Sequence, residues 1–259
     1  MSSMTPLEKA AQRSRHLLPL VAIALIGCLG GCEYEPDDVS FPSASFPSAR
    51  FPTTEADTIA PFPERGVLDA GTYLVTRYPG PFEITVPDGW VTYDGSGLGK
   101  DDPDLPDEWD IAVTFWPATH VPTDACAWRG ALVQVDPTAE AFVDAMTAQA
   151  STVSTPPVKV VVGDYSGFEF DHAVESDVDI TDCDGGKLCI NSDLAQGCDG
   201  REYRNVGWRE TYRAVDLNGE RAVIVLGQPH ESINPELTRE ARAIFDSIVF
   251  RSHKDQLMR

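Results

Sequence analysis

The hydrophobic pattern divides the chain into a short apolar run near the N-terminus, a proline-rich stretch and a long region with strand and helix periodicity. The apolar run covers residues 17–29, about 13 positions, whereas a helix that spans a bilayer needs about 20. Lys9, Arg13 and Arg15 precede the run. A basic segment, a short apolar segment and small residues follow one another in this order in export signals.

Two cysteines lie at the end of the apolar run, and each closes a four-residue sequence that resembles the bacterial lipobox, Leu-Ile-Gly-Cys28 and Leu-Gly-Gly-Cys32. Cleavage before Cys32 leaves four cysteines besides the lipidated one, an even set that can pair in an oxidising compartment, whereas cleavage before Cys28 leaves Cys32 as an odd thiol. We therefore predict that residues 1–31 are a lipoprotein signal peptide and that Cys32 is lipidated. Lipidation of Cys28 and secretion without a lipid are the alternatives.

A lipid on this cysteine would determine where the protein is located. One acyl chain binds a membrane only marginally, while several chains on an N-terminal cysteine hold it stably. The predicted location is therefore the outer face of a bacterial cell membrane, and the predicted membrane contact is made through the N-terminal lipid.

The stretch after the cleavage point is rich in proline and serine, and Phe-Pro recurs at Phe41, Phe46 and Phe51. Each proline removes an amide donor and biases the preceding residue toward extended backbone. We expect residues 32–65 to be a disordered linker that holds a folded domain away from the membrane. A docking motif for a partner is the alternative interpretation of the repeat.

Between residues 66 and 252 the pattern changes to short β-rich segments separated by turn residues, which predicts one folded domain. Asn218-Gly219 suits a hairpin turn because both residues tolerate a positive φ. The strands that this pattern predicts cover residues 71–77, 82–86, 111–116, 131–135, 158–162, 167–170, 204–215 and 220–226.

Two segments carry helix signals. Asp136-Pro137 provides a capping side chain and a proline at the first helical position, and Asn234-Pro235 does the same near the C-terminus. Because strands, a helix, strands and a helix follow one another, we predict an α+β domain, with two main helices packed on an antiparallel β-sheet. Residues 253–259 are expected to be a disordered tail.

Several short motifs resemble the PsbP-like fold, and most closely the small exported lipoproteins of actinobacteria that share it. These motifs are FEITVPDGW at residues 82–90, the strand pair around Gly163 and Gly167, the late hairpin and DSIVF at residues 246–250. The resemblance covers about residues 66–252. It implies an extracytoplasmic accessory or binding domain without a shared catalytic constellation, so no catalytic residue carries over. The Cys- and Asp-rich insertion at residues 176–200 is not part of the pattern.

The formal net charge of the chain is −21. Such a surface repels phosphate backbones and anionic lipid headgroups. The charge therefore argues against a nucleic-acid partner and against peripheral membrane binding through the folded domain. A protein partner or a small ligand remains open.

Four cysteines lie within the predicted domain, and they permit three pairings. We favour one disulfide between Cys126 and Cys198 and a second between Cys183 and Cys189. A zinc site is the competing interpretation, but no tight CxxC pair is present and export favours oxidation.

An acidic segment of the insertion resembles a calcium loop at first sight. Its carboxylates are the weak metal candidates Asp177, Asp179, Asp182 and Asp184. The spacing fails because the twelfth position counted from Asp177 is Leu188, where a calcium loop has Glu. We expect a solvated acidic loop here.

The sequence contains no catalytic signature. Ser166, in GDYSG, stands one place late for a nucleophile elbow, and the domain's histidines, His120, His172 and His230, form no HExxH motif. The five tryptophans, Trp90, Trp109, Trp116, Trp128 and Trp208, could line a ligand cleft, but aromatic core positions are the default.

We therefore predict a lipid-anchored accessory or binding protein that has no catalytic residue and no cofactor and is not an enzyme. An exported hydrolase with a dispersed active site and a carrier or sensor of a small apolar ligand are the alternatives.

Overall fold

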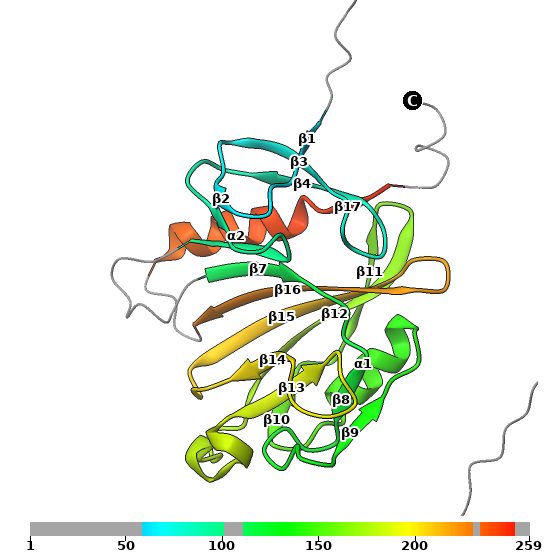
Figure 1. The fold of residues 1–259 in the computed structure, drawn as a ribbon, viewed down its shortest axis with the longest axis vertical. Coiled ribbons are helices and arrows are strands. Elements are labelled where there is room, and N and C mark those ends of the chain that lie inside the picture. Colours follow the sequence, from blue (N-terminus) through cyan, green and yellow to red (C-terminus); the bar gives the residue numbers. More distant parts are fainter. Residues whose placement is uncertain (1–58, 101–110, 230–233, 252–259) are drawn as a thin grey trace, which may run out of the picture. The chain divides into compact units, whose positions relative to one another are not determined.

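The computed structural model describes residues 59–100, 111–229 and 234–251, which form three β-sheets and two α-helices (Figure 1). Strand residues outnumber helical residues, so this part of the chain has a β-rich fold. The predicted α+β domain, with two main helices packed on one sheet, is wrong. The physical reason is that two smaller sheets provide much of the cover that the prediction assigned to helices.

The largest sheet has nine strands, and its neighbouring strands are all antiparallel. Its strands, in spatial order, are β10 (Thr152–Ser154), β12 (Tyr165–Val174), β15 (Trp208–Asp216), β16 (Arg221–Pro229), β7 (Ile111–Phe115), β6 (Gly97–Lys100), β5 (Val91–Thr92) and β2 (Gly66–Val67), and β11 (Val158–Val162) also pairs with β12. β15 and β16 form the predicted hairpin, and Asn218 and Gly219 in its turn have φ values of 56° and 108°.

A second sheet and the helix α2 (Pro235–Asp246) cover one face of the largest sheet. The strands of this second sheet are β1 (Ala60–Pro61), β3 (Gly71–Val75), β4 (Phe82–Val86) and β17 (Val249–Phe250). α2 begins where the sequence predicts, because Asn234 Oδ1 accepts from the backbone N–H groups of Glu236 and Leu237 at 3.2 Å. The helix buries Leu237, Ala241, Ile244 and Phe245 against the sheet.

A third sheet and the helix α1 (Ala139–Thr147) cover the opposite face. The strands of this third sheet are β14 (Gly200–Tyr203), β13 (Leu188–Ser192), β8 (His120–Pro122) and β9 (Leu132–Gln134). The cap of α1 is Thr138, whose hydroxyl accepts from the N–H of Ala141. The predicted cap, Asp136, lies two residues earlier, and its carbonyl accepts from Arg221 instead.

The strand β16 explains how the two cores are separated. Successive side chains of a strand point to opposite faces. Ala222, Ile224 and Leu226 belong to the core beneath α2 and the second sheet, whereas Val223 and Val225 belong to the core beneath α1 and the third sheet. The uninterrupted apolar run of this strand is therefore the signature of a sheet that is covered on both faces.

The four cysteines form two disulfides, Cys126–Cys183 and Cys189–Cys198, so the predicted pairing is wrong. The backbone N–H of Asp184 donates to the carbonyl of Cys126 at 2.9 Å, which brings Cys183 beside Cys126. Cys189 lies in β13 and Cys198 just before its hairpin partner β14, with 5.7 Å between their Cα atoms. Two disulfides indicate an oxidising compartment outside the cytoplasm.

In the part of the chain that the structure describes, no helix combines the length and the apolar character needed to cross a bilayer.

The register between β12 and β15 can be tested at Gly167. A Cβ atom at this position would lie 2.1 Å from the backbone oxygen of Ala214. Overpacking costs about 1–3 kcal/mol where side chains can adjust. Because a paired backbone cannot move aside, we expect Gly167→Ala to lower the free energy of unfolding by about 3 kcal/mol or more. Urea unfolding followed by tryptophan fluorescence measures the change.

The matched control is Gly71→Ala in β3, where the nearest atom to a new Cβ is 3.9 Å away. We expect this variant to stay within about 0.5 kcal/mol of the original protein. Equal losses in the two variants would contradict the register.

Candidate functional site

A fully buried carboxylate, that of Glu210, lies between the largest sheet and the third sheet. The hydroxyls of Tyr203 and Tyr212 each donate to its Oε2 at 2.6 Å. The indole N–H of Trp208 donates to its Oε1 at 3.1 Å, and the guanidinium of Arg201 forms an ion pair with the same oxygen. Burying a charge costs free energy unless the charge is paired and hydrogen-bonded. These four partners together offset that cost.

The strand periodicity positions this cluster. Trp208, Glu210 and Tyr212 alternate along β15, so their side chains share one face. The position opposite Glu210 on β16 is Gly227. A Cβ atom there would lie 2.8 Å from Nη2 of Arg201 and 2.9 Å from the ring of Trp208. Glycine therefore leaves room for the guanidinium and the indole beside the carboxylate.

His172 on β12 faces Glu210 across the sheet and is fully buried. Burial lowers the pKa of His172 to about 4, and the nearby charge of Glu210 opposes this shift only in part. Burial also raises the pKa of both Tyr203 and Tyr212 well above the usual value, and the charge of Glu210 adds to the effect. The imidazole is therefore neutral near pH 7, and both tyrosines keep the protons that they donate.

The side chain of Arg201 is partly exposed and links the buried cluster to the protein surface. Its Cζ lies 5.7 Å from the ring centroid of Trp116 and 5.7 Å from that of Trp208. Cations at such distances from an indole are attracted by its π system. The guanidinium is thus held between two indoles and tied to a buried carboxylate.

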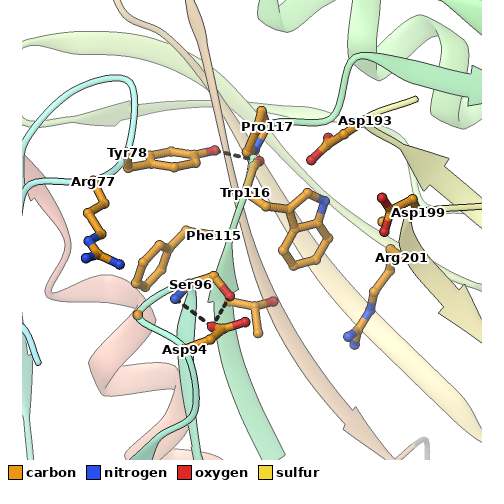
Figure 2. A pocket seen from close by; sticks show the side chains of 13 residues that line it. Arg77, Tyr78, Asp94, Ser96, Phe115, Trp116, Pro117, Asp193, Asp199 and Arg201 are labelled. Carbon is orange, nitrogen blue, oxygen red and sulfur yellow. Dashed lines mark hydrogen bonds between the residues drawn. The ribbon is translucent and has the colours of Figure 1, made fainter. Parts of the chain in front are cut away.

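The guanidinium of Arg201 borders a cleft of about 550 Å³, which we call the central cleft (Figure 2). The cleft lies between the β3–β4 loop, the β5–β6 turn, the end of β7 and the β13–β14 hairpin. Its aromatic and charged lining side chains are Tyr78, Phe115, Trp116, Asp94, Asp193, Asp199, Arg77 and Arg201. A second cleft of about 440 Å³, lined partly by Tyr203, Arg204 and Trp208, lies on the other side of Arg201.

Hydrogen bonds fix the aromatic wall of the central cleft. The indole N–H of Trp116 donates to Oδ1 of the buried Asn191 at 3.0 Å. The hydroxyl of Tyr78 donates to the carbonyl of Trp116 at 2.8 Å. Both the backbone and the ring of Trp116 are therefore held in place.

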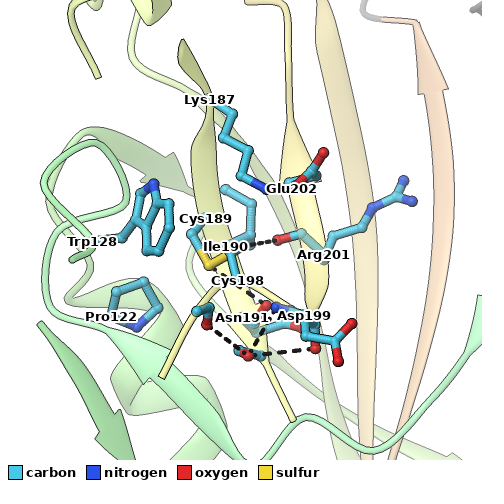
Figure 3. The surroundings of a disulfide bond; sticks show 12 residues. Pro122, Trp128, Lys187, Cys189, Ile190, Asn191, Cys198, Asp199, Arg201 and Glu202 are labelled. Carbon is cyan, nitrogen blue, oxygen red and sulfur yellow. Dashed lines mark hydrogen bonds and ion pairs between the residues drawn. A yellow bond between two sulfur atoms is a disulfide. The ribbon is translucent and has the colours of Figure 1, made fainter. Parts of the chain in front are cut away.

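The disulfide Cys189–Cys198 closes the β13–β14 hairpin, which forms the acidic wall of the cleft (Figure 3). Within this hairpin Oγ of Ser192 accepts from the backbone N–H groups of Leu194 and Asp199, each at 3.1 Å. The hairpin is thus cross-linked by a covalent bond and by hydrogen bonds, and these fix the backbone positions of Asp193 and Asp199.

The arginines of the cleft are neutralised, but its aspartates are not. Arg201 pairs with Glu210, and Arg77 pairs with Glu64. In the described ranges, by contrast, no ion pair includes any of the cleft's three aspartates, which are Asp94, Asp193 and Asp199. The cleft therefore carries an excess of negative charge.

The three aspartates differ in their surroundings. Hydrogen bonds from the hydroxyl and the backbone N–H of Ser96 lower the pKa of Asp94. Partial burial, followed by the charge of Asp199, raises the pKa of Asp193, while His120 acts in the opposite direction. Asp193 and Asp199 therefore repel each other across the hairpin.

Two of the tryptophans that the sequence suggested for a ligand cleft do line one: Trp116 lines the central cleft, and Trp208 lines the second cleft. Trp90 is buried and donates to Glu240 at 3.1 Å, and Trp128 is buried and donates to the carbonyl of Asp184 at 2.8 Å. Trp109 lies outside the described residues, as do His230, Cys28 and Cys32.

The structure does not bring the weak metal candidates together. Asp179 accepts from the hydroxyl and N–H of Thr181, and Asp184 accepts from the N–H of Arg129. Asp177 and Asp182 are exposed. No group of three or more His, Cys, Asp or Glu side chains within the described ranges could hold a metal ion.

Sequence reasoning missed the Arg201–Glu210 pair and the three aspartates of the cleft. A signal for the pair was present, because Arg201 and Tyr203, like Glu210 and Tyr212, stand two positions apart in strand-forming segments. Charged and aromatic residues at that spacing share one face of a strand. The cleft aspartates, in contrast, lie in turns and carry no such signal.

The pH dependence of stability tests the burial of His172. The unfolded state takes up a proton near pH 6.5, whereas His172 in the folded state does so only near pH 4. Its contribution is therefore complete above pH 6.5 and is lost as the pH falls toward 4, by about 3 kcal/mol in total. We expect His172→Leu to remove this part of the pH dependence, which urea unfolding at a series of pH values measures.

The control for this experiment is His120→Leu, at a partly exposed histidine. This variant should retain the dependence of the original protein. Parallel curves for the original protein and His172→Leu over the acidic range would show that His172 is not held neutral by burial.

No protein-family model matches the chain, and no curated protein matches it in sequence. The resemblance to PsbP-like lipoproteins therefore stays a prediction, and any function has to be inferred from the geometry of the central cleft.

Proposed function

We propose that this chain is a binding protein that acts outside the cytoplasm, is held at the outer face of the membrane by a lipid on Cys32, and is not an enzyme. The central cleft is the observation that carries the proposal. Its volume of about 550 Å³ lies in the range of small-ligand sites, which is about 300–1,000 Å³.

The walls of the central cleft are arranged before any ligand arrives. Trp116 is fixed by Asn191, Arg201 is fixed by Glu210, and the Cys189–Cys198 disulfide closes the hairpin that carries the acidic wall. Binding to a preformed site avoids the free-energy cost of ordering loops and side chains. Such rigidity supports a role in binding.

The buried titratable groups near the cleft have structural roles. Glu210 accepts from four donors, and His172 faces this buried cluster from β12. Neither side chain lines the central cleft. Both belong to the buried cluster behind its wall, so neither is placed for acid–base catalysis on a ligand in the cleft.

The charges of the cleft also favour a polar ligand over an apolar one. Its lining includes three aspartates and two arginines. An apolar molecule would desolvate these groups without replacing their hydrogen bonds to water, at a cost in free energy. We therefore favour a polar ligand over the apolar ligand of a carrier.

Native mass spectrometry of protein released gently from its own membranes tests the binding role. We expect a bound molecule on the original protein, and we expect its loss in Trp116→Ala because that ring forms the cleft wall. The control is Leu194→Ala, an exposed residue of the same hairpin that does not line the cleft. Retention of the bound molecule in Trp116→Ala, or its chemical conversion by the original protein, would contradict the proposal.

The lipid anchor has a separate test. We expect Cys32→Ser to abolish incorporation of labelled palmitate and to release the protein from the membrane fraction, whereas Cys28→Ser should change neither, because residue 28 is removed with the leader. Mass spectrometry of the N-terminal peptide identifies the modified residue. Cytosolic protein with an intact leader would exclude both the anchor and the proposed location.

A further inference from the structure

The central cleft offers a flat aromatic surface beside polar groups. Trp116 is half-buried, its only indole N–H is bonded to Asn191, and the guanidinium of Arg201 lies over part of its ring, so the rest of the ring is what remains for contact with a ligand. Figure 2 shows the ring between the Asp94–Ser96 side of the cleft and the side that carries Asp193 and Asp199. A ligand in the cleft therefore meets this ring.

Arg201 supplies hydrogen-bond donors to the cleft, while its positive charge is neutralised by Glu210. A guanidinium has five N–H donors. Among the residues that the structure describes, Glu210 alone accepts from Arg201, through Nε and Nη2, and it also neutralises the positive charge. The remaining donors are available at the edge of the two clefts that Arg201 lines. They suit a neutral acceptor such as a hydroxyl or ether oxygen.

Asp193 and Asp199 supply the acceptors. Both side chains are exposed, and in Figure 2 their carboxylates point toward the indole of Trp116 from the hairpin side. An ionised carboxylate accepts hydrogen bonds and donates none. A ligand at this wall must therefore bring its own donors.

These three features favour a neutral ligand that carries both donors and acceptors. An anion would be repelled by the cleft's aspartates. An amine would bind the carboxylates, but it could not accept from Arg201. An apolar ligand would leave donors and acceptors unpaired. Sugar hydroxyls both donate and accept, and the C–H face of a sugar ring can lie flat against an indole.

We propose that the central cleft binds a neutral oligosaccharide, with one sugar ring on Trp116 and hydroxyls bonded to Arg201, Asp193 and Asp199. This inference rests on the proposed binding function and names the class of ligand.

An array of neutral glycans that includes cellohexaose, maltohexaose and the hexamer of N-acetylglucosamine tests the inference with the full mature chain, followed by calorimetric titration of each hit. A hydrogen bond to a charged group is about twice as strong as one to a neutral group, which is what asparagine leaves. We expect Asp199→Asn to weaken binding about tenfold or more, and Trp116→Ala to abolish it. Because the ligand is neutral, its affinity should change little with salt.

The matched control is Asp177→Asn, which removes the same charge at an exposed aspartate that does not line the cleft. Its affinity should equal that of the original protein. Unchanged circular dichroism and melting of Asp199→Asn would show that this variant is folded.

Three outcomes would overturn the inference: no glycan binds, glycan binding survives in both Asp199→Asn and Trp116→Ala, or spermidine binds more tightly than any glycan and in a salt-dependent manner. In the last case the cleft would still be a binding site, so the proposed function would stand. Shortened glycans after incubation would have the opposite meaning, because the ligand class would hold and the non-enzymatic function would fail.

Discussion

The ion pair between Glu210 and Arg201 is the interaction on which the arrangement of the cleft depends. It joins β15 of the largest sheet to β14 of the third sheet, at a position where the carboxylate is fully buried. Removing one partner of a buried pair costs about 3–5 kcal/mol, because the other charge is left uncompensated. The third sheet is therefore held where Arg201 can reach Glu210, and Gly227 provides the space for that contact. The same contact places Arg201 between Trp116 and Trp208.

The layered fold explains why a cleft forms at this place. β16 contributes alternate side chains to two cores, so each face of the largest sheet must be covered. The second and third sheets provide that cover on opposite faces together with the two helices (Figure 1). The central cleft is lined by the β3–β4 loop of the second sheet, the end of β7 and the hairpin of the third sheet. Loops from all three layers thus meet around Trp116.

Features set by neighbouring residues could be predicted from the sequence, and features set by distant residues could not. The turn at Asn218-Gly219 and the start of α2 at Asn234 depend on local backbone preferences, and both are confirmed. The Cys126–Cys183 pairing joins residues 57 positions apart. It depends on how the loop around Asp184 folds back onto Cys126, which no local pattern encodes. The strand β13 lies within the predicted Cys- and Asp-rich insertion. Its Asn191 and Ser192 interrupt the apolar pattern, although both are buried and hydrogen-bonded.

The repulsion between Asp193 and Asp199 in the acidic wall of the cleft lowers the stability of the fold, and the other interactions of the hairpin offset this loss. Burial and the charge of Asp199 raise the pKa of Asp193, so the folded state binds a proton there more readily than the unfolded state. Ionisation of Asp193 therefore destabilises the fold as the pH rises above the usual range of an aspartate. The Cys189–Cys198 disulfide and the hydrogen bonds of Ser192 keep the two carboxylates close in spite of this repulsion. Departures from the most stable arrangement concentrate at functional sites. A ligand that donates hydrogen bonds to both carboxylates would relieve the repulsion, so the free energy stored in the hairpin would favour binding.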